Sequence, residues 1–148
     1  MTGARTGRPF SEKSYRDNDQ KAKNIIRGHL DFIGKFTNIM QEDYGVDIHE
    51  YDPATSTILW HEVEMKNQWT GDWPDSWKEV RIPARKARLL KAATDITFWV
   101  IRQDGLRAWA ISGTVMTEDK IKSVSIRTAP EGERFFCIPV ELCRLVIL

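Results

Sequence analysis

The chain has 148 residues, a formal net charge of +1 and a hydrophobic content of 41%. This length suits one domain with a substantial core, and the six Trp and six Phe residues argue against disorder. The near-neutral charge excludes a nucleic-acid-binding protein of the strongly basic kind. No apolar run approaches the ~20 residues of a membrane span, and the first residues lack the apolar core of a signal peptide, so we expect a cytoplasmic protein without a membrane partner.

Basic residues are concentrated in two segments, although the total charge is small. One lies within residues 1–27 and the other within residues 78–91, and an acidic and aromatic stretch separates them. Basic segments beside an acidic pocket suit contacts with phosphate groups around a metal site. This distribution keeps a nucleic acid among the candidate partners.

The first part of the chain predicts an arm and a helix. Residues 1–16 are rich in Gly, Ser, Thr and Arg without clear periodicity, which indicates a flexible basic arm before a single domain at residues 17–148. From Asp19 onward apolar residues recur at helical spacing. Gly34 is the expected C-cap of this helix.

A short strand and a β-hairpin are predicted next. Residues 36–40 suit the short strand, residues 46–51 and 58–66 suit the two strands of the hairpin, and turn-forming residues 52–57 join them. Residues 68–76 contain too many Gly, Pro and Asp residues for a regular element.

The second half of the chain continues with a helix and further strands. Pro83 is expected to begin a helix that ends near Ala93. An Asp-Gly turn is expected to join two strands as a hairpin. The remaining predictions are strands at 97–102, 106–112 and 134–140, a short helix at 118–125 and a helical end at 141–148. This order indicates an α/β or α+β fold, with a central mixed β-sheet flanked by helices.

The register of the predicted hairpin determines which side chains meet. If Tyr51 faces Ile58, then Asp47 lies opposite Glu62 and diagonal to Glu64 on the same face. Three carboxylates would then converge, which is unfavourable unless a cation binds there. A shift of one residue would move Asp47 to the other face.

One strand of this hairpin combines an acid and a base. Glu64 and Lys66 point to the same face because side chains alternate, whereas Met65 points to the opposite face. Metal-dependent cleavage of a phosphodiester needs hard oxygen ligands for Mg²⁺ and a positive charge near the attacking water. Carboxylates and a lysine supply these two requirements.

Two short segments resemble the core of the PD-(D/E)XK nuclease superfamily. They are residues 45–48, Gly-Val-Asp-Ile, and residues 62–66, Glu-Val-Glu-Met-Lys. The small size of the chain is similar to that of Holliday-junction resolvases. Val46 departs from the family motif, in which a proline precedes the aspartate.

The resemblance implies a restriction-endonuclease-like core and a set of site residues. Asp47, Glu64 and the main-chain carbonyl of Met65 would bind Mg²⁺ or Mn²⁺, and Lys66 would orient the nucleophilic water. Members often add an acidic residue from the first helix, for which Asp19 is the candidate here. The expected activity is that of a metal-dependent endonuclease that hydrolyses DNA, with selectivity for branched DNA as one form.

The resemblance also implies DNA as the partner and a homodimer as the assembly. The candidates for contacts with the DNA backbone are Arg81, Arg85 and Lys86. A solvated helix face explains Arg85 and Lys86 equally well, and both interpretations stay open.

Several residues near the motif have a structural interpretation beside a functional one. Glu62 is either a further metal ligand or, as we favour, a polar residue at the pocket edge, since Mg²⁺ takes few protein ligands. We expect ordinary polar contacts, rather than metal binding, for His49 and His61. Stacking on nucleic-acid bases is one interpretation of Trp69, Trp73 and Trp77. We favour packing in a core, which is the commoner role of tryptophan.

Two further functions suit the same fold. One is a catalytically inactive nucleic-acid-binding module, and the other is an interaction subunit that uses exposed tryptophans. The complete set of Asp47, Glu64 and Lys66 favours an enzyme, because a module without chemistry has no use for like charges gathered around a lysine.

Overall fold

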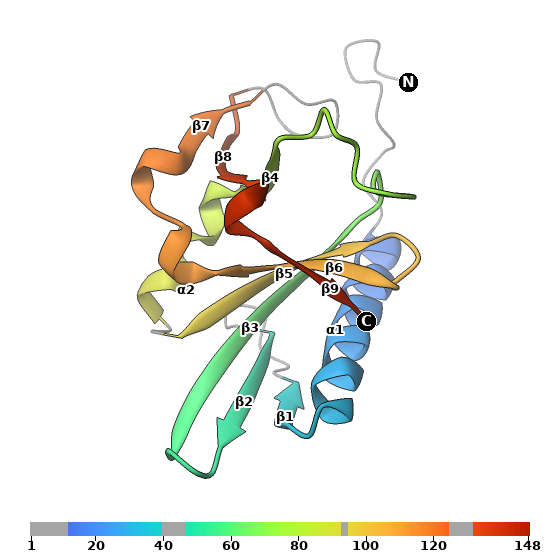
Figure 1. Cartoon of the computed structure of the whole chain (residues 1–148), viewed down its shortest axis with the longest axis vertical. Helices are drawn as coiled ribbons and strands as arrows, with labels where there is room; N and C mark the ends of the chain where they lie inside the picture. The colour runs from blue at the N-terminus through green and yellow to red at the C-terminus, as the bar shows by residue number, and fades with distance from the viewer. Residues whose placement is uncertain (1–11, 40–46, 93–94, 125–131) are drawn as a thin grey trace.

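The computed structural model describes residues 12–39, 47–92, 95–124 and 132–148. In these residues the fold contains a six-stranded sheet, a three-stranded sheet and two α-helices, as Figure 1 shows. Helices and strands are not arranged as a regular βα repeat, so the fold class is α+β.

The six-stranded sheet combines strands from distant parts of the chain. Its strands are β1 (Phe36–Ile39), β2 (Ile48–Asp52), β3 (Thr57–Lys66), β5 (Ile96–Arg102), β6 (Arg107–Ser112) and β9 (Arg144–Ile147). Their order is β1-β2-β3-β5-β6-β9, with β3 and β5 parallel and the other neighbours antiparallel. The predicted mixed sheet is therefore confirmed.

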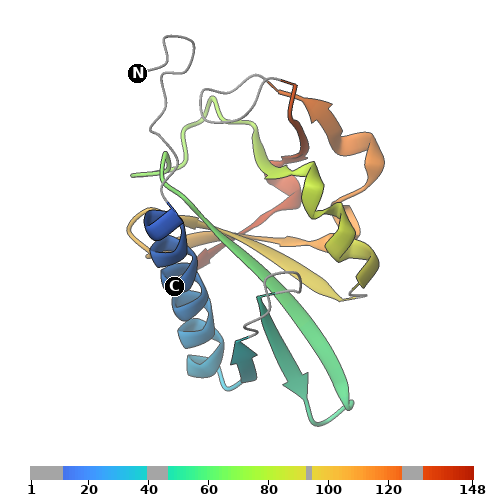
Figure 2. The same cartoon turned by 180° about the vertical axis from the view of Figure 1, so that it is seen from behind.

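A helix covers one face of this sheet and a smaller sheet covers the other. Helix α1 (Glu12–Phe32) packs on its face through Ala22, Ile26 and Leu30, as Figure 2 shows from behind. The opposite face carries the small sheet, of order β4-β8-β7. The elements on that side are β4 (Glu79–Pro83), α2 (Ala87–Ala92), β7 (Ile121–Ser123) and β8 (Arg134–Pro139). Four 3₁₀ helices complete the described chain: η1 (Ala84–Lys86), η2 (Gly113–Val115), η3 (Glu118–Lys120) and η4 (Val140–Leu142).

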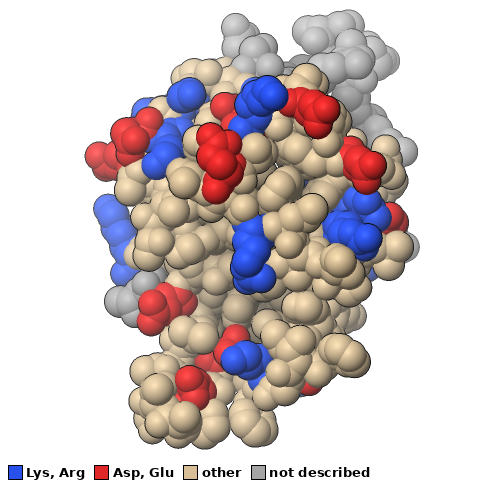
Figure 3. All heavy atoms as spheres, viewed as in Figure 1, with Lys and Arg blue, Asp and Glu red and all other residues tan. Residues whose placement is uncertain are grey.

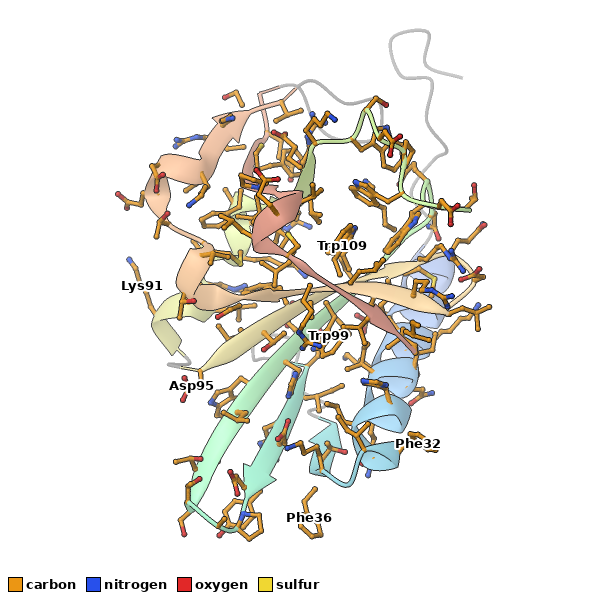
Figure 4. All side chains as sticks on the ribbon, viewed as in Figure 1. Phe32, Phe36, Lys91, Asp95, Trp99 and Trp109 are labelled. Atoms are coloured by element: carbon orange, nitrogen blue, oxygen red, sulfur yellow. The ribbon has the colours of Figure 1, made fainter. Side chains whose placement is uncertain are left out.

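Strand β5 separates two apolar clusters because its side chains alternate between the faces. Phe98 and Val100 pack with the small sheet, whereas Trp99 and Ile101 pack with α1. Figure 4 shows Trp99 and Trp109 on opposite sides of the sheet. A strand covered on both faces is expected to be nearly continuously apolar, as β5 is from Phe98 to Ile101.

Helix α1 begins earlier than the apolar pattern indicates. It begins at Glu12, not near Asp19, so residues 12–16 of the expected arm are helical, while residues 1–11 lie outside the described part. Residues 12–18 are mostly polar, so the apolar periodicity that predicts the helix does not extend to them. Gly34 has a φ of 88°, which confirms the predicted C-cap. None of the helices in the described residues is both long and apolar enough to cross a membrane.

The two predicted hairpins are confirmed. Tyr51 pairs with Ile58 in the β2–β3 hairpin, which is the predicted register. Strands β5 and β6 are joined at Gly105, whose φ of 75° suits glycine in a tight turn.

Three predicted helices are wrong in whole or in part. Pro83 ends strand β4 and does not begin a helix, and α2 begins at Ala87 after a 3₁₀ turn. The helix expected from residue 118 is a 3₁₀ turn followed by β7, and in place of the expected C-terminal helix η4 is followed by strand β9. Strands β4 and β9 pair with segments far away in sequence and β7 pairs with β8, and in each case this pairing overrides the local pattern.

A buried polar network lies between α1 and the sheet. His61 Nδ1 accepts a hydrogen bond from Trp99 Nε1–H at 2.9 Å, so its proton is on Nε2, 2.9 Å from Glu50 Oε1. Burial lowers the pKa of His61, although Glu50 opposes this effect. Lys35 lies 3.8 Å from the second oxygen of Glu50. The predicted polar contacts of His61 are thereby confirmed.

We expect His61→Ala to destabilise the protein by about 3 kcal/mol, because it leaves the buried Glu50 carboxylate without its hydrogen-bond donor. His49→Ala is the matched control on the neighbouring strand. His49 is only partly buried and contacts the ring of Trp60, so its loss should matter much less. Urea unfolding followed by tryptophan fluorescence measures both, and equal effects would contradict the network's role.

Candidate active site

Two carboxylates lie side by side where β2 begins against β3. The β2–β3 register places Asp47, the residue before β2, beside Glu62. Asp47 Oδ2 accepts a hydrogen bond from the Val63 N–H at 2.9 Å, which fixes the carboxylate at the edge of β3. Glu64 follows on the same face of this strand by alternation. The predicted facing of Asp47 toward the acids of β3 is therefore confirmed.

Asp47 is electrostatically strained by its surroundings. Burial and the negative charge of Glu62 raise the pKa of Asp47 to about 7, although the Val63 N–H favours the ionised form. Glu62 is also within hydrogen-bonding reach of Asp47 when one of the two carboxyl groups carries a proton. Two adjacent buried carboxylates are stable only if they share a proton or a cation.

Lys23 reaches this pair from helix α1. Its Nζ lies 3.5 Å from Asp47 Oδ1 and 3.0 Å from Asp19 Oδ2. Burial alone would lower the pKa of Lys23, but Asp19 and Asp47 outweigh it, so the pKa is raised and the ammonium stays charged. Asp19, the expected additional metal ligand, is therefore linked to Asp47 through the ammonium of Lys23.

Lys86 enters the group from the opposite side, on η1. Its Nζ lies 2.9 Å from Glu62 Oε2, and only 16% of its side chain is exposed. Burial alone would lower the pKa of Lys86, but the charges of Glu64 and Glu62, with a smaller effect of Asp47, raise it overall. The interpretation of Lys86 as a solvated residue is corrected, whereas its contact with DNA stays a prediction. The tight 3₁₀ turn after β4 directs it toward β3, where an α-helix from Pro83 was expected.

Glu62 is buried, with 8% exposed, so its interpretation as a residue at the pocket edge is also wrong. Its Oε1 atom has no hydrogen-bond partner among the described residues, although Oε2 is paired with Lys86. An unpaired buried carboxylate oxygen is costly unless something positive reaches it.

Lys66 lies at the end of β3, on the face of Glu64. Burial lowers the pKa of Lys66, Glu64 raises it, and Arg81 lowers it, with a net decrease. Its Nζ is 5.6 Å from the centre of the Trp77 ring, a cation–π distance. Within the described chain, the Lys66 ammonium forms no hydrogen bond or ion pair, and its nearest interaction is this contact with Trp77. Met65 packs on the opposite face with the α1 cluster, as alternation predicts.

The other two predicted DNA-binding residues lie outside the acidic group and are paired with acids. Arg81 Nε is 2.9 Å from Glu79, and Arg85 Nη1 is 2.7 Å from Glu133. The Arg85 side chain is 69% exposed. On the face seen in Figure 3, basic and acidic side chains are interspersed and form no extended patch of one sign.

The predicted packing role of the tryptophans is confirmed. Trp69 is buried in the core, and Trp73 and Trp77 are partly buried against the same cluster. The Trp73 ring contacts both others edge to face, and its Nε1–H donates to the Trp77 carbonyl at 2.7 Å.

The donor atoms of this group suit a hard divalent cation. In the residues that are described, no three His, Cys, Asp or Glu side chains are arranged to hold a metal ion directly. The ammonium groups of Lys23 and Lys86 form ion pairs with Asp47 and Glu62, respectively. Mg²⁺ is usually held by only one or two carboxylates and by water, however, and the unpartnered Glu62 Oε1 is an oxygen that such an ion would satisfy. The residues present thus fit Mg²⁺ or Mn²⁺.

Comparison with known proteins adds no relative: no family model, no curated protein and no solved structure matches the chain. The chemistry of the site residues is therefore the basis for assigning a function.

Proposed function

We propose that this protein is a metal-dependent nuclease that hydrolyses DNA phosphodiester bonds, of the PD-(D/E)XK type. The observation that carries the proposal is the gathering of Asp47, Glu62 and Glu64 around Lys86, with Lys66 beside Glu64. A mixed sheet with α1 on one face is compatible with the restriction-endonuclease-like core that the resemblance implies.

The site residues divide into ligands and a positive group. Asp47 and Glu64, with the Met65 carbonyl, would hold Mg²⁺ or Mn²⁺. When bound, such an ion withdraws charge from the phosphate and makes water a better nucleophile. Lys66 supplies a positive charge on the same face, where it orients the water and stabilises the charge that develops on the phosphate. Its stem is partly buried, which limits the positions that its ammonium can take.

Incubation with DNA in the presence of Mg²⁺, Mn²⁺ or EDTA tests this function. The substrates are linear, supercoiled, single-stranded and four-way-junction DNA, with RNA of matched sequence as a further substrate. Cleavage in Mg²⁺ or Mn²⁺ and none in EDTA is the expected result. A homodimer, which could cut both strands at symmetric positions, stays a prediction that sedimentation analysis tests.

A DNA-binding module without activity is the second candidate, and a specific observation favours it. Lys23 and Lys86 neutralise Asp47 and Glu62 without any metal. Lys66 favours the enzyme, because a partly buried lysine without an ion pair in the described residues is poorly explained by stability alone. Binding of DNA and Mn²⁺ without cleavage of any substrate would select the module.

We expect Arg81→Ala combined with Arg85→Ala to weaken DNA binding and to flatten its salt dependence. Both side chains are partly or largely exposed, and both residues are close to Lys86 in sequence. Each lost phosphate contact lowers the slope of log K against log salt by roughly 0.9, so loss of both lowers it by about 2. Fluorescence anisotropy over a salt series in EDTA measures the slope. Lys91→Ala is the control, since Lys91 is exposed and points away from the sheet (Figure 4). An unchanged slope would leave the two arginines as surface ion pairs only.

A further inference from the structure

Lys86 lies on η1, directly after β4, and its side chain is largely buried, which is unusual for a lysine. Its ammonium is buried against Glu62 at 2.9 Å, and the charges of Glu64 and Asp47 also act on it. The Glu62 side chain is 10% exposed, and its Oε1 atom has no partner in the described residues. One oxygen of this carboxylate thus binds an ammonium, and the other meets no donor among the described residues while Asp47 is ionised.

Apart from a proton shared with Asp47, a cation is the occupant that the negative charges of this group favour beside Glu62. The buried Glu62 and the partly buried Asp47 and Glu64 would repel one another if nothing positive lay among them, and Lys86 supplies that charge from one side. A divalent cation bound to Asp47 and Glu62 would repel the ammonium at this short distance. Because the ammonium is carried by a flexible four-carbon stem, it can move when the cation arrives.

We propose that Lys86 is an exchangeable counter-ion: it neutralises Glu62 while the site holds no metal, and a divalent cation displaces it and takes Glu62 as a further ligand. This inference rests on the proposed function for the identity of the occupant, a hard divalent cation. It adds Glu62 to the ligands that the sequence motif supplies, and it makes Lys86 a competitor of the metal.

A purely structural lysine predicts a different result when it is replaced. Loss of a structural ion pair would lower stability and leave metal affinity unchanged or weaker. Loss of a competing counter-ion raises metal affinity, because the cation no longer has to displace a like charge. Metal affinity, measured without DNA, therefore separates the two roles.

Calorimetric titration with Mn²⁺ of the wild type and of Lys86→Met is the decisive experiment. Methionine keeps the length of the stem and removes the charge. We expect the variant to bind Mn²⁺ more tightly by on the order of tenfold or more. In EDTA the melting temperature of the variant should be lower than that of the wild type. Addition of Mn²⁺ should raise it by more than it raises the melting temperature of the wild type. Affinity equal to or weaker than that of the wild type would overturn the proposal.

Two variants serve as controls. Lys91→Met, an exposed lysine on α2 that points away from the sheet in Figure 4, should leave Mn²⁺ affinity unchanged. Glu62→Gln in the Lys86→Met background should cancel the gain, because it removes the proposed ligand. Glu62→Gln alone keeps Lys86 and should weaken Mn²⁺ binding, so the ligand role of Glu62 is tested even if Lys86→Met does not fold. Unchanged binding in Glu62→Gln would also overturn the proposal.

The outcomes distinguish this inference from the proposed function. Wild-type protein that cuts DNA with Mn²⁺, together with a Lys86→Met variant of unchanged Mn²⁺ affinity, would reject the counter-ion and keep the nuclease. Tighter Mn²⁺ binding by Lys86→Met, in a protein that cuts no substrate, would keep the counter-ion and reject the nuclease.

Discussion

Asp47→Ala and Glu64→Ala are each expected to reduce DNA cleavage by on the order of a thousandfold. Each replacement removes a hard oxygen ligand that water does not fully replace. Single-turnover assays in Mg²⁺ measure the loss, and titration with Mn²⁺ should show weaker metal binding in both variants.

Both variants should remain folded. Asp47→Ala gives up the hydrogen bond from the Val63 N–H and the contact with Lys23, but it also relieves the repulsion between Asp47 and Glu62. Circular dichroism and thermal unfolding check this. Asp119→Ala is a suitable control, since the Asp119 side chain is 76% exposed on η3 and lies outside the acidic group.

If either variant kept full, metal-dependent activity, that carboxylate would be excluded as a ligand. Glu62 would then be the next residue to replace, because it lies closest to Asp47 in the register of the hairpin and has a buried oxygen without a partner in the described residues.

The β2–β3 hairpin and its acidic residues could be predicted from the sequence because a short turn and the alternation of side chains, both local features, determine them. The pairing of Tyr51 with Ile58 follows from a short turn between two segments of suitable pattern. Alternation along β3 then assigns Glu62, Glu64 and Lys66 to one face without any knowledge of the rest of the fold.

The small sheet could not be predicted in the same way. Strand β4 pairs with β8, more than fifty residues later in the chain, and neither segment contains a turn that fixes its partner. Pro83 is typical of a helix start, but it suits the end of a strand equally well when no further ladder bond is needed. Because β4 was not predicted, Lys86 was assigned to an α-helix that begins only at Ala87, and its contact with Glu62 was not foreseen.

Lys23 was missed although the sequence contains a signal for it. It lies next to Ala22 and three residues before Ile26, at the border of the apolar face of α1. A lysine at such a border extends along the packed surface and places its charge near the sheet. Its partner Asp47 comes from a hairpin strand that meets α1 only in the folded chain, so the pairing itself depends on tertiary structure.

Replacement of Lys66 is expected to separate catalysis from binding. Lys66→Met keeps most of the buried stem and removes the ammonium, which lies on the face of Glu64 and near the Trp77 ring. Because the Lys66 ammonium has no hydrogen bond or ion pair within the described residues, the change should cost little stability. Thermal unfolding should therefore be close to that of the wild type, which excludes misfolding as the reason for lost activity.

We expect the positive charge of Lys66 to be needed for the cleavage step but not for the binding of Mn²⁺ or DNA. We expect cleavage by Lys66→Met to fall by on the order of a hundredfold or more, as for loss of one electrostatic group that acts in the transition state. Mn²⁺ and DNA should still bind, since no ligand oxygen and no exposed phosphate contact is removed. Calorimetry and a single-turnover assay on one preparation measure both. A Lys66→Met variant that cuts at the wild-type rate would remove Lys66 from the mechanism, and a variant that loses Mn²⁺ binding in parallel would make it a residue that organises the site.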